Sequence, residues 1–142
     1  MRNRERREAG FTLLEIMVVI VILGLLVALV APSVLGNQDK AMVQKARADI
    51  AALGSALKMY KLDNFRYPTT EQGLQALVSA PSIGPKAKNY RQEGYIDALA
   101  NDPWGGPYQY RYPAANGKFA VYSLGADGTE GGEGYDADIG RP

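Results

Sequence analysis

The feature that most constrains this chain is an apolar segment of about 25 residues near its N-terminus, from Phe11 to Leu35. A helix of that length crosses the ~30 Å hydrocarbon core of a membrane. The ten residues before the segment contain four arginines and two glutamates, whereas the segment itself contains no basic residue. Because basic residues favour the cytoplasmic side of a membrane span, we expect a cytoplasmic N-terminus and a C-terminal portion on the other side.

Membrane insertion alone leaves two simpler interpretations open. A secretory signal peptide is removed after its apolar core, but this run is long for such a core and Val30-Ala31-Pro32 is a poor cleavage site. A plain signal anchor explains the length but does not explain Glu15, which lies inside the segment. A charged side chain at the centre of a membrane span costs about 2.5–3.5 kcal/mol on insertion scales, so it is usually paired and functional.

The residues around Glu15 resemble a known signal. Gly10-Phe11-Thr12-Leu13-Leu14-Glu15, followed by Ile-Met-Val-Val-Ile, is similar to the class III signal of type IV pilins and pseudopilins. The resemblance implies that an inner-membrane prepilin peptidase cuts between Gly10 and Phe11 and methylates the new amine of Phe11. It also implies that Glu15 acts in assembly, where its carboxylate neutralises the Phe11 amine of a neighbouring subunit. The apolar helices would then pack at the centre of a filament through head-to-tail contacts that do not close.

Gly24 and Pro32 interrupt the apolar helix in the sequence. Pro32 has no amide proton, and its ring crowds the carbonyl group of Ala28. A kink of the kind found in many membrane helices is the simpler interpretation. The resemblance implies more, namely a loss of helical order between Gly24 and Pro32 in the assembled filament.

After Gly36-Asn37 the pattern becomes that of an amphipathic helix. Apolar residues recur at alternating steps of three and four, which predicts a helix face packed on a globular domain. They are Val43, Ala46, Ile50, Leu53, Leu57 and Tyr60. Joined to the apolar segment, the helix would run from about Phe11 to Leu62. A heptad coiled coil is the alternative, but the pattern is short and rich in alanine.

Shorter elements are expected in the remainder of the domain. Thr69 and Gln72 have the spacing of a capping box, which predicts a short helix to about Val78. The stretch 79–102 is rich in proline, glycine and charge and predicts a long ordered loop. Two strands are expected at 107–112 and 118–123, with a hairpin loop at 113–117. So small a sheet needs to pack on the long helix to be stable.

Composition argues against catalysis. The 142 residues include no cysteine and no histidine, which removes thiolate zinc sites, cysteine nucleophiles, imidazole bases and disulfides. A formal net charge of +1 gives no reason to expect nucleic acid as a partner. No Gly-x-Ser-x-Gly elbow or phosphate loop is present. We therefore expect no enzyme, and a small domain that gains stability from a metal ion or from other subunits.

Acidic residues alternate with glycines from Leu124 to Gly140. The simplest interpretation is a solvated, flexible loop. Calcium is the sharper hypothesis, because this ion takes six to eight oxygens from carboxylates, backbone carbonyls and water. Glycine lets the backbone turn its carbonyls inward. The spacing is not that of an EF-hand, and magnesium is less suited to a loop that offers many carbonyls.

Three further segments narrow the resemblance to the major pseudopilin family of type II secretion, over essentially the whole chain. They are Met-Tyr-Lys-Leu-Asp-Asn at 59–64, Arg-Tyr-Pro-Thr-Thr-Glu-Gln-Gly-Leu-Gln-Ala-Leu-Val at 66–78 and Asp-Pro-Trp-Gly at 102–105. The loop pattern of that family matches 124–128, 131–132 and 137–140, and implies bound Ca2+. Its implied ligands are the side chains of Asp127 and Asp138 and the carbonyls of Leu124 and Thr129, with Asp136 as an additional candidate. Many relatives end Ile-Gly-Asn-Trp, whereas this chain ends Ile139-Gly140-Arg141-Pro142.

Together these inferences predict an α+β protein with the type IV pilin-like fold. A long N-terminal α-helix, its first half transmembrane, would pack on a small antiparallel β-sheet, beside a calcium-binding C-terminal loop. The expected parts are a leader at 1–10, a transmembrane and filament-core helix at 11–35 and a periplasmic globular domain at 36–142.

The resemblance also implies a function and a location. The chain would be the major structural subunit of the type II secretion pseudopilus, crossing the bacterial inner membrane once. Polymerised in the periplasm, it would drive folded proteins through the outer-membrane secretin. Its implied partners are other copies of itself, minor pseudopilins, the inner-membrane assembly platform, the prepilin peptidase and the secretin, and no nucleic acid.

Two alternatives remain at this point. A type IV pilin or a minor pseudopilin is the alternative in the same class, although the absence of cysteine argues against pilins with a C-terminal disulfide loop. A membrane-anchored periplasmic binding module is the alternative from another class. It would need a pocket of converging polar groups, which the sequence does not indicate.

Overall fold

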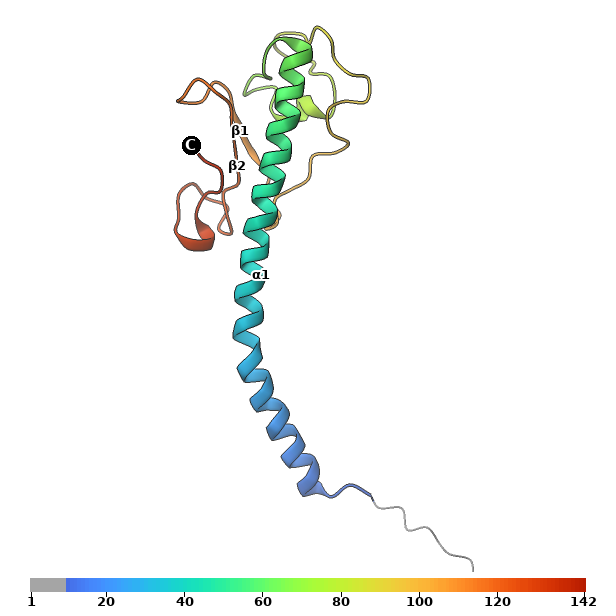
Figure 1. The fold of residues 1–142 in the computed structure, drawn as a ribbon, viewed down its shortest axis with the longest axis vertical. Coiled ribbons are helices and arrows are strands. Elements are labelled where there is room, and N and C mark those ends of the chain that lie inside the picture. Colours follow the sequence, from blue (N-terminus) through green and yellow to red (C-terminus); the bar gives the residue numbers. More distant parts are fainter. Residues whose placement is uncertain (1–9) are drawn as a thin grey trace, which may run out of the picture. The chain divides into compact units, whose positions relative to one another are not determined.

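The computed structural model describes residues 10–142, so most of the predicted leader lies outside the described part of the chain. Two compact units are present, one ending at Gln38 and the other comprising Asp39–Pro142. The elements in chain order are α1 (Leu13–Asn64), η1 (Leu74–Leu77), β1 (Gln109–Arg111), β2 (Ala120–Tyr122) and η2 (Gly134–Asp136) (Figure 1). The predicted α+β class is confirmed.

Helix α1 spans 52 residues and passes without a break through Gly24 and Pro32. The predicted joined helix from about Phe11 to Leu62 is therefore confirmed, and neither Gly24 nor Pro32 ends it in the isolated chain. Pro32 removes a single backbone hydrogen bond, and the remaining hydrogen bonds of the long helix keep the backbone helical. A loss of helical order in an assembled filament stays a prediction.

The first part of α1 is apolar and packs against nothing else in the described part of the chain. Residues Leu13–Val30 have a mean hydropathy of 3.2, and none of this stretch is buried. It is long and apolar enough to cross a membrane. Water is a poor environment for so much exposed apolar surface, so this segment requires lipid or neighbouring subunits around it.

The second part of α1 supplies one wall of the hydrophobic core. Ala46, Leu53, Leu57 and Tyr60 are buried, as their helical spacing predicts. The other wall comes from η1 and from the two strands. It contributes Leu74, Ala76, Leu77, Tyr108 and Val121. The predicted packing of the small sheet against the long helix is confirmed.

Strands β1 and β2 form an antiparallel pair in which Tyr110 lies opposite Val121. Each strand is shorter than predicted and centred where the sequence placed it. A bridge between Ser123 and Ile139 then brings the C-terminal loop beside the end of β2. This bridge holds Ile139, near the end of the loop, beside the sheet.

The predicted capping box is present, but the helix after it is a short 3-10 helix. Thr69 N–H donates to Oε1 of Gln72 at 3.0 Å, and Gln72 N–H donates to Oγ1 of Thr69 at 3.2 Å. Gly73 follows with φ at 61°, a left-handed conformation that ends regular helix geometry. Helix η1 therefore begins only at Leu74.

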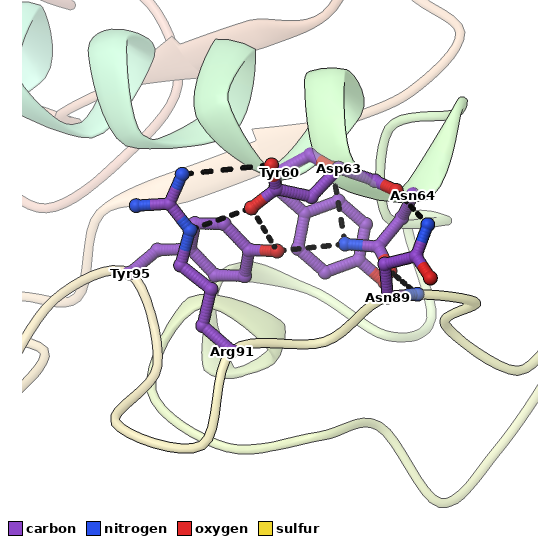
Figure 2. Close-up of polar contacts among 6 residues, drawn as sticks. All are labelled: Tyr60, Asp63, Asn64, Asn89, Arg91 and Tyr95. Carbon is purple, nitrogen blue, oxygen red and sulfur yellow. Dashed lines mark hydrogen bonds and ion pairs between the residues drawn. The ribbon is translucent and has the colours of Figure 1, made fainter.

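The long loop between η1 and β1 contains no helix or strand and is ordered by polar contacts with the end of α1 (Figure 2). Nε of Arg91 lies 2.6 Å from Oδ2 of Asp63, which also accepts a hydrogen bond from the Tyr95 hydroxyl at 3.1 Å. The hydrogen bond from Arg91 lowers the pKa of Asp63. Buried Asn64 donates to the Tyr95 hydroxyl and accepts from the Asn89 amide. The predicted ordered loop is confirmed.

Candidate functional site

The first candidate site is the start of α1. Thr12 precedes the helix, and its Oγ1 accepts a hydrogen bond from the backbone N–H of Glu15 at 3.2 Å. This N-cap satisfies one of the amides that a first helical turn leaves unpaired. Glu15 thus lies in the first turn, where the helix dipole favours a carboxylate. The Thr-x-x-Glu spacing could have indicated the capping role of Thr12 from the sequence.

Gly10 and Phe11 lie free of the rest of the described chain. Phe11 is 80% exposed, and a Cβ built on Gly10 would meet no described atom within 4 Å. The fold itself therefore has no need for glycine at position 10. Any requirement for glycine there must come from a protein that binds this segment.

The second candidate site is the C-terminal loop, and a buried carboxylate anchors its first residues. Oδ2 of Asp102 accepts a hydrogen bond from the Ser123 hydroxyl at 2.5 Å, and Ser123 is fully buried. Oδ1 of Asp102 accepts from the backbone N–H groups of Trp104 and Gly106. The Ser123 oxygen in turn accepts from Gly125 N–H at 3.2 Å. Asp102 thus joins the Asp-Pro-Trp-Gly turn to the start of the loop, a role that the sequence pattern did not indicate.

Asp138 is the most buried of the three acidic residues among the predicted ligands. Its side chain is 7% exposed, and its Oδ2 accepts hydrogen bonds from Gly131 N–H at 3.2 Å and from Arg141 at 2.8 Å. Its Oδ1 is buried and has no hydrogen-bond partner among the residues that the structure describes. A buried carboxylate oxygen without a donor is costly, so this atom fits a site for a cation.

Arg141 is a participant that the sequence analysis missed. Its guanidinium group bridges Asp138 and Oε2 of Glu130, the latter at 3.1 Å. The hydrogen bond from Arg141 to Asp138 raises the pKa of this arginine. The sequence pattern left Glu130 without a role, whereas the structure makes it part of this ion pair.

Asp127 and Thr129 form a local turn. Oδ1 of Asp127 accepts from Thr129 N–H at 3.0 Å, and Oδ2 accepts from the Thr129 hydroxyl at 2.8 Å. The hydrogen bond from the Thr129 backbone lowers the pKa of Asp127. The carboxylate is thus ionised and exposed, a state in which it can bind a cation.

The remaining predicted ligands lie on either side of this turn. Leu124 is half-buried against a small cluster of Ala114, Ala120 and Tyr122, and Asp136 is exposed in η2. A Cβ on Gly132 would overlap the carbonyl oxygen of Asp136, and one on Gly125 would come within 2.8 Å of it. Only glycine allows the backbone to approach this closely.

Between residues 10 and 142, no three acidic side chains converge tightly enough to form a carboxylate cluster for a metal ion. A calcium site here would therefore use few carboxylates and several carbonyl oxygens, as the sequence pattern predicts. The free Oδ1 of Asp138 and the tightly folded glycines fit such a site. The set of five ligands stays a prediction.

Two models of protein families match the chain. The family described as "Type II secretion system (T2SS), protein G" matches residues 33–142, and the "Prokaryotic N-terminal methylation motif" matches residues 6–31. The second match covers Gly10, Phe11 and Glu15.

Individual proteins are similar over nearly the full length. A type II secretion system core protein G from Pseudomonas aeruginosa is 57% identical over 138 residues, covering 97% of this chain and 97% of that protein. One from Vibrio cholerae is 59% identical, covering 98% and 94% respectively. The crystal structure of the major pseudopilin from the type 2 secretion system of enterohaemorrhagic Escherichia coli has a TM-score of 0.66 and 53% identity. That comparison covers 74% of this chain and 90% of the solved one.

Proposed function

The chain belongs to the type II secretion system protein G family and is a membrane-anchored structural subunit of the pseudopilus, and we propose how its parts serve assembly. The observation that carries the proposal is the uncovered apolar half of α1, directly preceded by the processing motif. Such a segment is stable in lipid before assembly and among identical helices after it. The same helix can therefore act first as an anchor and then as a filament core.

Processing is the first step of the proposal. The N-terminus lies in the cytoplasm and the unit Asp39–Pro142 in the periplasm, as the basic residues before the apolar segment favour. The prepilin peptidase cuts between Gly10 and Phe11 and methylates Phe11. The open surroundings of Gly10 support this assignment, because they leave the segment accessible to an enzyme.

Assembly is the second step. Glu15 lies in the first turn of α1, one turn beyond the amine that processing creates on Phe11. In lipid both charges are costly alone, and pairing between neighbouring subunits removes both costs. The pair also sets the axial position of an incoming subunit. The inner-membrane assembly platform, the minor pseudopilins and the outer-membrane secretin are the partners that this filament requires.

The third part of the proposal is that the C-terminal loop binds a calcium ion. Asp138 would bind the ion through its free Oδ1, Asp127 through its ionised carboxylate, and Leu124 and Thr129 through their carbonyls, with Asp136 beside them. The ion would supply positive charge that holds the loop closed. Arg141 offsets part of the negative charge of Asp138, so the other carboxylates and the carbonyls of the loop would have to supply more of the attraction for the ion.

Mass spectrometry of protein purified from native membranes tests the proposal. We expect N-methyl-Phe11 as the first residue. In a Gly10→Trp variant we expect unprocessed precursor, because the fold tolerates a side chain there and only the peptidase would not. An intact Met1 terminus or cleavage after Ala31 in the wild-type protein would contradict the processing step.

A further inference from the structure

The C-terminal end of α1 carries an apolar surface that the fold does not cover. Met59, Leu62 and Phe65 expose 45%, 76% and 71% of their surface. Met59 and Leu62 lie three apart on α1 and are neighbours on its surface, and Phe65 directly follows the end of the helix, so the three exposed side chains lie together at this end of α1. None of them packs in the hydrophobic core of the described residues.

Phe65 is held in a conformation that a bulky residue rarely adopts. It follows the last residue of α1 with φ at 64°, and its N–H donates to the carbonyl of Lys61 at 2.7 Å. Glycine or asparagine usually occupies this position after a helix. Because an aromatic ring here adds strain and no buried contact, it points to a role outside the chain's own fold.

Basic residues surround this patch. Lys58 and Lys61 lie on the same helix face, and Nζ of Lys88 lies 5.9 Å from the centre of the Phe65 ring. The acidic residue in the last turn of α1 is Asp63, whose charge Arg91 already neutralises. We refer to Lys58, Met59, Lys61, Leu62, Phe65 and Lys88 as the helix-end surface, which is apolar at its centre and positive at its rim.

The C-terminal loop has the opposite charge and lies at the other end of the same compact unit (Figure 1). From Leu124 to Pro142 it contains five carboxylates and the single guanidinium group of Arg141. The loop packs beside the earlier part of α1, where it shares a cavity of about 410 Å³ with Val43 and Arg47. The helix rise places Arg47 about 22 Å from Leu62 along α1.

We propose that the helix-end surface of one subunit docks on the acidic C-terminal loop of a second copy of this chain. The proposal rests on the proposed assembly into a filament and names the surfaces that make one of its contacts. Opposite charges at the rims favour this partner and orient it. With its five carboxylates and one arginine, the loop keeps a net negative charge even when a calcium ion is bound.

The position of the two surfaces determines what such a contact builds. They are different surfaces at opposite ends of one unit, so the contact is heterologous. Each docked copy presents a free surface of the same kind as the one it has covered. The contact therefore extends along the filament and does not close into a dimer.

Site-directed cross-linking in cells tests this contact in the full chain, which has no native cysteine to interfere. Leu62→Cys lies in the helix-end surface and Tyr135→Cys lies exposed in the loop. With both substitutions in one chain, a short bis-maleimide should give a ladder of dimers, trimers and longer products. Two singly substituted chains made together should give dimers only. Leu62→Cys with Asn116→Cys, in the exposed hairpin loop, is the matched control and should give no ladder.

Charge reversal provides the second arm. Lys61→Glu in the doubly substituted chain should reduce the ladder about five- to tenfold, because a favourable charge pair becomes a repulsive one. Adding Glu133→Lys should restore the ladder to within about twofold, since the exchanged pair attracts again. If the second substitution restores the ladder, the loss in the Lys61→Glu variant was not caused by misfolding.

Filaments are counted by electron microscopy in the same cells. Filaments without the Leu62–Tyr135 ladder overturn the proposed contact and leave the proposed function intact. No filaments from the wild-type chain overturn both. A closed dimer from the doubly substituted chain, or cross-linking of Leu62→Cys to a different protein, also overturns the contact.

Discussion

Replacing Ser123 by alanine should strongly destabilise the unit Asp39–Pro142, although the substitution removes only one hydroxyl group. The hydroxyl group donates to Oδ2 of Asp102 at 2.5 Å and accepts from Gly125 N–H at 3.2 Å. Asp102 is 6% exposed and Ser123 is fully buried, so water cannot replace either bond without rearrangement. Leaving buried polar groups unpaired costs about 1–3 kcal/mol each, and bonds to charged groups are at the upper end. We expect the free energy of unfolding to fall by about 3 kcal/mol.

Fluorescence of Trp104, the single tryptophan of the chain, measures this loss directly. Its backbone N–H is bound to Asp102, so the signal reports on the same turn. With a urea dependence of about 1.5 kcal/mol per M, the unfolding midpoint of the full chain in detergent should fall by about 2 M.

Ser55→Ala is the matched control, because Ser55 is exposed on α1 and its hydroxyl only donates to the carbonyl of Ala51 within the helix. Its midpoint should stay near that of the wild-type protein. If Ser123→Ala and Ser55→Ala unfold at the same urea concentration, the buried contact between Ser123 and Asp102 does not anchor the loop.

Three further predictions concern assembly, the metal and pH. Glu15→Val should insert into the membrane at least as well as the wild-type chain and yield few filaments, because the lone carboxylate is costly in lipid and is kept for pairing. Calcium should raise the melting temperature of the full chain in detergent. A calcium concentration a hundredfold above Kd should add about 2.7 kcal/mol to the free energy of unfolding. Asp138→Ala should abolish this shift in melting temperature. Glu133→Ala should keep it, since the side chain of Glu133 is exposed and makes no capping hydrogen bond to η2. The lowered pKa of Asp63 contributes stability that is present above its unfolded-state pKa and lost as the pH falls through its folded-state pKa. Arg91→Ala should remove this part of the acid sensitivity, as measured by melting temperature against pH.

Each of these predictions has a result that contradicts it. Normal filament yield and secretion from Glu15→Val would remove the pairing argument. Equal melting temperatures in calcium and in chelator would mean that the loop binds no calcium in this domain. An unchanged acid transition in Arg91→Ala would show that its ion pair with Asp63 does not govern the pH dependence.

The local patterns of the sequence account for much of this protein. The apolar run, the Gly-Phe-Thr-Leu-Leu-Glu motif, the amphipathic stripe, the capping box at Thr69 and the two strands were all predicted correctly. Each of these features repeats or signals within a few residues, so it is visible without knowing the path of the chain. The joined helix from about Phe11 to Leu62 was predicted as well, and α1 continues through Pro32 because one lost hydrogen bond is a small cost in so long a helix.

The tertiary structure decided which polar groups meet. Asp102 and Ser123 lie 21 residues apart, Asp63 and Arg91 lie 28 apart, and Arg141 reaches back to Glu130. No periodicity marks such pairs, because each depends on loops that turn at left-handed glycines and on a sheet that packs against α1. For the same reason the sequence identified the acidic loop residues only as a group, and only the fold buries Oδ1 of Asp138 with no donor from residues 10–142. The exposed, strained Phe65 likewise became informative only once the core had formed without it.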